Sequence, residues 1–479
     1  MNIDSSGLLD LPRDIASTPT SDTGHRLLLR GGTIISMDPT IGNLPKGDIL
    51  IQGSKIVEIS IEITAGNAEI IDATDMIMIP GLVDTHRHAW EGQLRRINPN
   101  SPTLEDYCNA THFSFATAYR PRDVYVGNLI TALGCIDAGI TTIIDNSHNA
   151  RSGAHSDAAV EALIDSGIRA VHAPGAPLTG EWDKANWPHD LKRLQTKYFG
   201  DGDQLVTLAM MSQIDREAWA FARHLGIRIV TEFFGKEMAS ELDALHRDGL
   251  LGPENIFNHC TGLPDSGWEI LRAAGVSVNV CPRSDAHYAL EDGMCAYQIA
   301  LDYDMRPGLS VDNESSYSGD MFMEMRVAFY LQRTVAQGRR YLGHHNAPQP
   351  VLVHKLLEAA TIDGAACAGL SDQVGSLTVG KAADIIMIRA SDINLYPSNN
   401  ALGTVVHAAE RSNIDTVIVG GRVRKRAGQI LDLNILKLKT ATEESREHLF
   451  SATGYEPDMF SDAFVPLHNN HPSESELSA

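Results

Sequence analysis

Hydrophobic residues in the middle of the chain occur in short runs rich in Val, Ile and Thr, and several of these runs directly follow a glycine. Glycine is common just beyond the end of a helix, and a short β-branched run is typical of a buried strand. The glycine-led runs are residues 139–144, 167–171, 226–230 and 275–280. Together with similar runs at residues 76–83, 205–210, 256–259 and 309–311, they predict eight strands separated by helices.

Strands that alternate with helices favour a parallel sheet in an α/β fold. Eight such units predict a closed (β/α)8 TIM-like barrel, which we place over residues 80–372, with catalytic groups at the C-terminal ends of its strands. The alternative is an open doubly wound sheet, but no G-x-G-x-x-G motif follows the first strand. The barrel is therefore the predicted fold.

Both flanks of the barrel segment have a different pattern, with short strand-like runs separated by glycines. Neither residues 25–79 nor residues 373–432 contain enough strands for a stable sheet, so we expect the two chain ends to build one small β-sandwich domain. Residues 1–24 are rich in Ser, Thr, Asp and Pro, which predicts a mobile arm. Residues 433–479 are expected to form a C-terminal helix and a tail.

Composition and net charge exclude some classes of binding partner. The chain has 479 residues and a net charge of -22, and such a surface would repel the phosphates of nucleic acid. No apolar run is long enough to span a bilayer, no signal peptide is evident, and the six cysteines form no C-x-x-C pair. We expect a cytoplasmic protein with reduced thiols, a small-molecule substrate, and no membrane or nucleic-acid partner. Homo-oligomerisation is left open.

The most informative motif ends the first predicted barrel strand. His86 and His88 are separated by one residue, so their side chains point the same way from an extended backbone and can bind one metal ion. The alternative is a polar strand end with two exposed histidines. Other predicted strand ends also carry imidazoles or carboxylates: Asp145, His148, His172, Glu232, His259 and Asp312. Such convergence is what a mononuclear catalytic metal needs.

Several motifs resemble those of the amidohydrolase superfamily, in the branch of cytosine, guanine and S-adenosylhomocysteine deaminases and triazine hydrolases. The resemblance extends in order over residues 27–435, in the segments 80–88, 258–260, 281–285, 310–312 and 375–384. It implies that His86 and His88 are the first two metal ligands. It also implies that Asp312 holds both the metal and a water molecule, and that His259 orients or protonates the reacting centre.

These roles imply a metal-dependent hydrolase of non-peptide carbon–nitrogen bonds in a small heterocyclic molecule, in which a metal-activated water attacks an electrophilic carbon. The fourth predicted strand ends without a lysine that would bridge two metals, so one divalent ion is expected. Zinc is the first choice, with iron or manganese as alternatives. Two other outcomes stay open: the same scaffold with hydrolytic dechlorination or a lyase reaction, and a metal-free barrel with a binding role only.

The fifth predicted strand departs from the family pattern. Glu232 occupies the position of a histidine ligand, and Gly235 occupies that of a proton-shuttling glutamate. Three interpretations of Glu232 remain: a metal ligand, an acid–base group beside a metal held by three residues, or part of a decayed site. As a ligand, a second carboxylate would make the bound water less acidic and favour harder metals.

Substrate contacts are expected from three further residues. Trp90 and Gln93 follow His88 closely and offer stacking and amide hydrogen bonds, with loop packing as the alternative. Arg283 lies in the motif at residues 281–285 and is given the same role.

Overall fold

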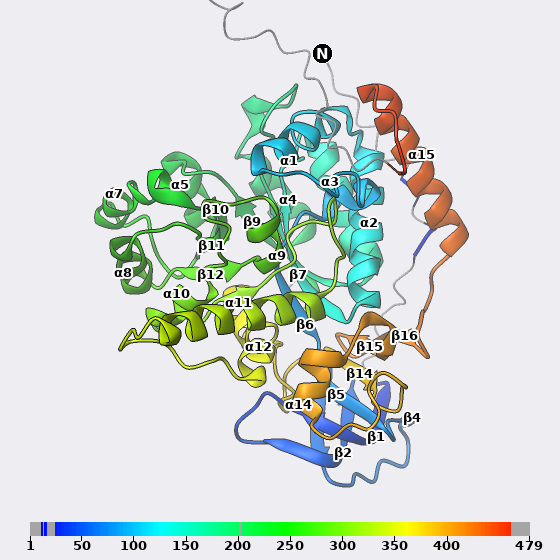
Figure 1. Cartoon of the computed structure of the whole chain (residues 1–479). Coiled ribbons are helices and arrows are strands. Elements are labelled where there is room, and N and C mark those ends of the chain that lie inside the picture. Colours follow the sequence, from blue (N-terminus) through cyan, green and yellow to red (C-terminus); the bar gives the residue numbers. More distant parts are fainter. Residues whose placement is uncertain (1–10, 13, 17–23, 201–203, 461–479) are drawn as a thin grey trace, which may run out of the picture.

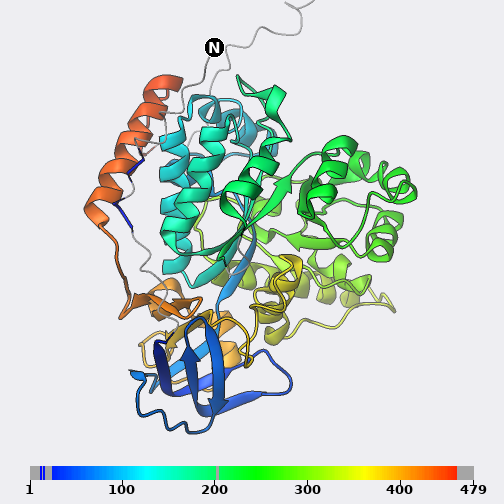
Figure 2. The same cartoon turned by 180° about the vertical axis from the view of Figure 1, so that it is seen from behind.

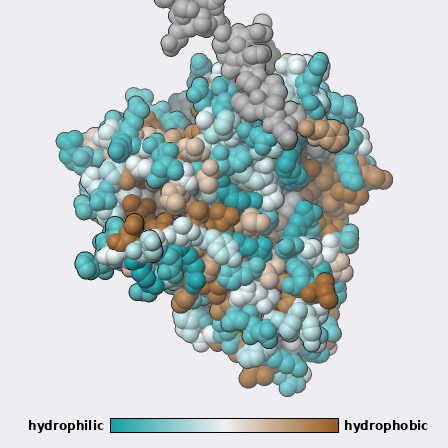
Figure 3. Space-filling view, in the orientation of Figure 1, coloured by the Kyte–Doolittle hydropathy of each residue, from teal (hydrophilic) through white to brown (hydrophobic). Residues whose placement is uncertain are grey.

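The computed structural model describes residues 11–12, 14–16, 24–200 and 204–460. Figure 1 shows a barrel of strands and helices, a small sheet domain beneath it, and helix α15 (Ile435–Thr453) along one side. In the turned view of Figure 2, segments from the start of the chain (blue) and from near its end (orange) lie together in the small domain. Hydrophilic residues cover much of the face drawn in Figure 3.

Eight parallel strands form the barrel, as the hydrophobic pattern predicts. In sheet order they are β6 (Leu82–Arg87), β7 (Ile140–Ser147), β8 (Arg169–Pro174), β9 (Val206–Met211), β10 (Arg228–Phe233), β11 (Asn255–His259), β12 (Ser277–Val280) and β13 (Gly308–Leu309). The gap between β13 and β6 is bridged by backbone hydrogen bonds. The Asp312 N–H donates to the His86 carbonyl at 2.9 Å, and the His88 N–H donates to the Asp312 carbonyl at 2.8 Å.

Helices pack around this sheet, and three of them end at glycines that the sequence marks as helix ends. Gly167, Gly226 and Gly275 follow α3, α5 and α8 with φ of 71°, 69° and 73°, a left-handed conformation that a Cβ disfavours. The helices of the barrel segment are α1 (Leu104–Ala110), α2 (Pro121–Asp137), α3 (Gly153–Ser166), α4 (Asp190–Tyr198), α5 (Arg216–Leu225), α6 (Gly235–Ala239), α7 (Leu242–Arg247), α8 (Asp265–Ala274), α9 (Pro282–His287), α10 (Tyr297–Asp302), α11 (Met321–Tyr341), α12 (Val353–Ala359) and α13 (Ile362–Cys367).

Strands from both chain ends share one nine-stranded sheet. They are β1 (Arg26–Ile35), β2 (Asn43–Gln52), β3 (Lys55–Ser60), β4 (Glu69–Asp72), β5 (Met76–Pro80), β14 (Ile385–Arg389), β15 (Ile414–Val419), β16 (Arg422–Arg426) and β17 (Gln429–Ile430). The antiparallel pairing of β5 with β14 joins the N-terminal strands to the C-terminal ones. A short helix, α14 (Ala401–Gly403), lies between β14 and β15.

The apolar run at residues 76–83 is divided between two sheets. Its first part is β5 of the small sheet, and its last part begins β6 of the barrel. Gly81 lies between them. A Cβ at this position would collide with the side chain of Thr141, so the close approach requires a glycine. The motif with His86 and His88, predicted to bind metal, therefore lies at the far end of β6 from the small domain.

Helix α15 packs against α2, where Ser445 donates a hydrogen bond to Asp123 at 2.8 Å. Part of the N-terminal segment that we expected to be mobile is packed here: Ile15 is buried, and its carbonyl accepts from the Asn434 N–H at 2.9 Å. Residues 1–10, 13 and 17–23 of the predicted arm, and the tail after residue 460, lie outside the described residues. Within the described part of the chain, we find no helix with the length and apolar character needed to cross a membrane.

A buried ion pair ties the barrel to the small domain. Arg169 of β8 donates two hydrogen bonds to Asp384, at 2.9 and 3.0 Å. Because removing one partner leaves the other charge buried, Asp384→Ala is expected to lower the free energy of unfolding by about 3–5 kcal/mol. Chemical denaturation measures this, with Arg272→Ala as control, since Arg272 forms an exposed pair with Asp304 that is worth less than about 1 kcal/mol. Equal losses in both variants would contradict the prediction.

Candidate active site

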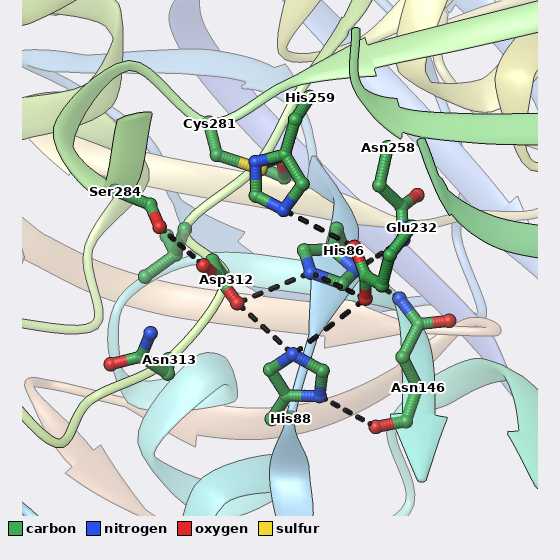
Figure 4. A network of polar contacts seen from close by, with 12 residues as sticks. His86, His88, Asn146, Glu232, Asn258, His259, Cys281, Ser284, Asp312 and Asn313 are labelled. Atoms are coloured by element: carbon green, nitrogen blue, oxygen red, sulfur yellow. Dashed lines mark hydrogen bonds and ion pairs between the residues drawn. The ribbon is translucent and has the colours of Figure 1, made fainter. Parts of the chain in front are cut away.

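Four side chains meet at the C-terminal mouth of the barrel (Figure 4). Oδ1 of Asp312 lies 3.1 Å from Nε2 of His86 and 3.2 Å from Nε2 of His88. Oε1 of Glu232 lies 3.4 and 3.8 Å from the same two nitrogens. The two imidazoles predicted to act together therefore face two carboxylates across one small space.

The backbone holds these groups in place at the strand ends. His86 and Arg87 end β6, His88 follows directly after the strand, and all three side chains are buried. His259 and Asp312 have φ of 68° and 75°, a region that residues with a Cβ rarely adopt and that is often found at functional sites.

The site has the features that a metal ion requires. Nε2 of His86, Oδ1 of Asp312 and both carboxylate oxygens of Glu232 are buried without a hydrogen-bond partner among the described residues. Nε2 of His86, Nε2 of His88 and Glu232 also lie close enough together to share one ion. Buried anionic oxygens are costly unless a cation or a donor compensates them, so this nitrogen and oxygen donor set fits a divalent ion such as zinc, iron or manganese.

Neighbouring polar groups orient the two imidazoles. Nδ1 of His88 lies 2.9 Å from the Asn146 carbonyl oxygen, and a carbonyl accepts only from a protonated nitrogen. In the neutral ring, Nε2 of His88 is thereby left with a lone pair toward the site. Nδ1 of His86 faces the amides of Asn146 and Asn258, whose oxygens can accept its proton if the amides are turned. Asn146 was not recognised from the sequence, because asparagines at strand ends are common.

His259 lies beside the cluster. Its Nε2 is 3.2 Å from Oε2 of Glu232, and its Nδ1 is 2.8 Å from Oδ1 of Asp285. Burial opposes a charge on this ring, but Cys281 and the two carboxylates outweigh burial and raise the pKa of His259 well above its usual value. The ring is therefore placed to hold a proton next to the reacting centre.

A cavity of about 130 Å³ opens onto the cluster. Five of the side chains that line it are apolar: Leu104, Leu178, Phe234, Met238 and Leu290. Tyr107, His112 and His148 add polar groups. Burial lowers the pKa of His112 well below its usual value and the pKa of His148 to about 3, so both histidines are uncharged at neutral pH. Tyr107 and His112 were missed from the sequence, since Tyr107 lies in α1 and His112 just after it, both far from any strand end.

The three residues predicted to touch substrate do not line this cavity. Trp90 is fully buried and packs edge-on against Tyr119, 5.1 Å between ring centres. Gln93 donates to the Asp123 carbonyl, at 3.0 Å, and to Ser445 of α15. Arg283 is paired with the buried Glu324, at 2.5 Å. Packing therefore explains Trp90 and Gln93, the alternative that the sequence left open, and an ion pair explains Arg283.

Apart from Glu232, no glutamate is among the described residues that line the cavity, so none of them replaces the glutamate missing at position 235. Gly235 has φ of 76°, and the space where a Cβ would lie is filled by the carboxylate of Glu291. Glu237, a residue that could have folded back into the site, is exposed and does not line the cavity. Proton transfer in this site therefore depends on His259, Glu232 and Asp312.

Metal binding should release a proton from His88. Burial disfavours charge on this imidazole, but Asp312, Glu91 and Glu232 outweigh burial and raise the pKa of His88 to about 10. Below that pH the metal-free ring is protonated, and a metal must displace this proton. Calorimetric titration of metal-free protein at pH 7.5 (about physiological), in buffers of different ionisation enthalpy, is expected to show release of about one proton per metal. Heats that do not depend on the buffer would contradict this.

Comparison with known proteins places the chain in a family. The sequence model of the amidohydrolase family matches residues 77–424. A 5-methylthioadenosine/S-adenosylhomocysteine deaminase from Desulforamulus reducens is 26% identical over 428 residues, covering 83% of this chain and 93% of the relative. Among solved structures, a zinc-bound adenosine deaminase from Xanthomonas campestris has a TM-score of 0.76 at 21% identity, covering 90% of this chain and 100% of its own.

The atrazine chlorohydrolase TrzN from Arthrobacter aurescens TC1, in a mutant complex with zinc and atraton, also has a TM-score of 0.76 at 21% identity, covering 88% of this chain and 100% of its own. These structural likenesses support the barrel fold. The resemblance seen in the sequence motifs is confirmed by the family match, which covers most of the chain. The chain belongs to the amidohydrolase family and is an enzyme that hydrolyses carbon–nitrogen bonds in small molecules.

Proposed function

We propose that this enzyme binds one divalent ion, zinc in the first instance, between the two imidazoles of β6 and the carboxylates of Asp312 and Glu232, and that it removes an amino group from a small heterocycle. The observation that carries the proposal is the convergence of four ligand groups from three separate segments of the chain, of which His86, His88 and Asp312 are buried and Glu232 is largely so. An ion bound there would acidify a water molecule and polarise the reacting group.

Asp312 is the proposed general base. Ser284 donates a hydrogen bond to its Oδ2, which leaves Oδ1 directed at the imidazoles. Burial favours the neutral acid, but His86 and His88 outweigh burial and lower the pKa of Asp312 well below its usual range. The group is therefore a carboxylate at neutral pH and is able to accept a proton from water.

His259 is the proposed proton donor to the leaving nitrogen. The hydrogen bond with Asp285 fixes the ring, and the proximity of Glu232 favours the imidazolium. Such a group stabilises negative charge on the reacting centre and can then transfer a proton. In this proposal it takes over the task of the glutamate that is missing at position 235, while Glu232 acts as a metal ligand. Acid–base work by Glu232 remains the alternative.

The cavity supports a small, uncharged or cationic substrate. No Arg or Lys is among the described residues that line it, so a carboxylate or phosphate on the substrate would lack a partner. Its apolar walls suit the faces of an aromatic ring, and the uncharged imidazoles of His112 and His148 can donate to or accept from ring nitrogens. An aminated heterocycle satisfies all of these features, in line with the deaminase names of the relatives.

Hydrolytic dechlorination is a second candidate, and the glycine at position 235 favours it. Chloride leaves without receiving a proton, so that reaction would not need the missing shuttle. The test is metal analysis of purified protein followed by assays of ammonia and chloride release over a panel of aminated and chlorinated heterocycles. We expect ammonia release that is lost after chelation and restored by zinc. Chloride release alone would favour the second candidate, and turnover that survives complete metal removal would overturn both.

The small domain has a supporting role in this proposal. We infer that residues 25–79 and 373–432 form a β-sandwich around an apolar core that contains Leu29, Ile49 and Met387, at the end of β6 opposite the active site. A cytoplasmic location and homo-oligomerisation stay predictions.

A further inference from the structure

A second, larger cavity lies on the outside of the barrel. Its volume is about 1140 Å³, and its walls come from α2, α15, the start of α11 and the loop that follows β6. Seven Arg or Lys and five Asp or Glu line it, whereas the whole chain has 39 Arg and Lys against 61 Asp and Glu. The cavity thus concentrates positive charge on a strongly acidic protein.

Three of the cationic residues have no ion-pair partner within the described ranges. Arg326, Lys439 and Arg446 lie along this cavity without a carboxylate within ion-pair distance, although Arg326 donates to the Val406 carbonyl at 3.1 Å. Uncompensated cations that share one cavity attract anions from solution.

One wall contains a single carboxylate shared by three arginines. Glu314 pairs with Arg87 at 3.4 Å, with Arg95, and with Arg96 at 3.9 Å. Burial and the repulsion of Arg95 and Arg411 outweigh the attraction of Glu314 and lower the pKa of Arg96. Glu314 alone therefore does not balance the charge at this wall.

Arg96 is also held in an unusual backbone conformation. Its φ is 59°, which disfavours residues with a Cβ, and its N–H donates to the Glu314 carbonyl at 2.9 Å. The side chain remains 54% exposed, at a distance from Glu314 beyond hydrogen-bond range. Its guanidinium is thus free to bind a second anion.

We propose that this cavity is a binding site for a small molecule carrying a phosphate group, or for inorganic phosphate itself, with Arg96 and Arg411 as its main ligands. Guanidinium groups bind phosphate oxygens in a bidentate manner. Arg411 also lines the cavity and is 65% exposed, and although it pairs with Asp137, its charge is close enough to act on Arg96. The residues of this site are separate from those that line the active-site cavity.

The site is connected to the metal ligands through two buried ion pairs. Arg87, which lies between His86 and His88, pairs with Glu314 and also with Asp84 at 2.7 Å. Asp84 in turn accepts from the Val311 N–H at 3.0 Å, next to Asp312. An anion that draws Arg95 and Arg96 away from Glu314 changes the charge balance around Arg87, so anion binding and metal affinity are expected to be linked.

The test uses the zinc-loaded full chain at constant ionic strength. Binding of inorganic phosphate, glycerol 3-phosphate and ribose 5-phosphate is measured by isothermal calorimetry against chloride. We expect at least one of them to bind, and Arg96→Asn and Arg411→Gln each to weaken binding about tenfold, as expected for loss of a charge-assisted contact. Asparagine tolerates a left-handed φ, so Arg96→Asn tests the guanidinium and not the backbone. Arg272→Gln, at an exposed pair elsewhere, should bind like the wild type.

The outcomes separate the possible sources. Phosphate alone identifies a free-anion site, and tighter binding of the organic phosphates identifies a metabolite site. No binding above chloride by any of the three, or equal affinity in the wild type and both cavity variants, would overturn the proposal. If phosphate binds at the metal centre instead, the wild type and both cavity variants should bind it with equal affinity.

Discussion

An Asp312→Asn protein is expected to lose about 10²–10⁴ of its turnover rate, the range that a positioned acid–base group contributes. The amide keeps the size of the side chain and the hydrogen-bonding distance to Ser284, but it cannot accept a proton from water. It also removes one negative charge from beside two imidazoles. The measurement is the rate of ammonia release at saturating substrate, with metal content determined on the same sample.

A matched control separates loss of chemistry from loss of charge in general. Asp302→Asn removes a carboxylate that pairs with Arg339 on the surface and should leave the rate unchanged. A rate for Asp312→Asn within about tenfold of the wild type would contradict the base role, since that is less than the smallest contribution typical of such a group.

Glu232→Ala is expected to lower metal affinity by about 10²-fold or more, together with the rate. Loss of a group that only supports a ligand costs 10–100-fold in metal affinity, and Glu232 faces both imidazoles of β6 directly. Metal titration with a competing chelator measures the affinity, and ammonia release measures the rate. Full affinity with lost activity would instead assign Glu232 to acid–base work.

Glu232→His completes this experiment. A histidine restores the ligand type that the family pattern has at this strand end, and it removes one negative charge from the site. If Glu232 is a ligand, the variant should bind zinc at least as tightly as Glu232→Ala and recover part of the activity. A variant that binds zinc well but stays inactive would show that the carboxylate itself takes part in the reaction.

The barrel could be predicted because its strands are local features. Several strands are marked by a glycine at the end of the preceding helix and by the short apolar run that follows it. A short segment such as residues 226–230 therefore predicts a strand without information from the rest of the chain. The close approach of Gly81 to Thr141 could not be predicted, because the two residues are distant in sequence. The hydrogen bond between Ile15 and Asn434 could not be predicted for the same reason, since it also joins residues that are distant in sequence.

The same distinction applies to the active site. His86, His88 and Asp312 lie where the barrel topology places strand ends, and the structure brings them together. Trp90 and Gln93 were misplaced because the chain turns into a buried 3₁₀ segment, Ala89–Leu94, directly after β6. In that segment the side chains point into the packing with α2 and α15 instead of into the cavity.

The most direct test of this account is the anomalous diffraction of crystals of the metal-loaded enzyme. We predict one strong peak within coordination distance of His86, His88, Asp312 and Glu232. A fully loaded protein with no peak there, or with its metal bound elsewhere, would contradict the central claim that these four side chains form a metal site.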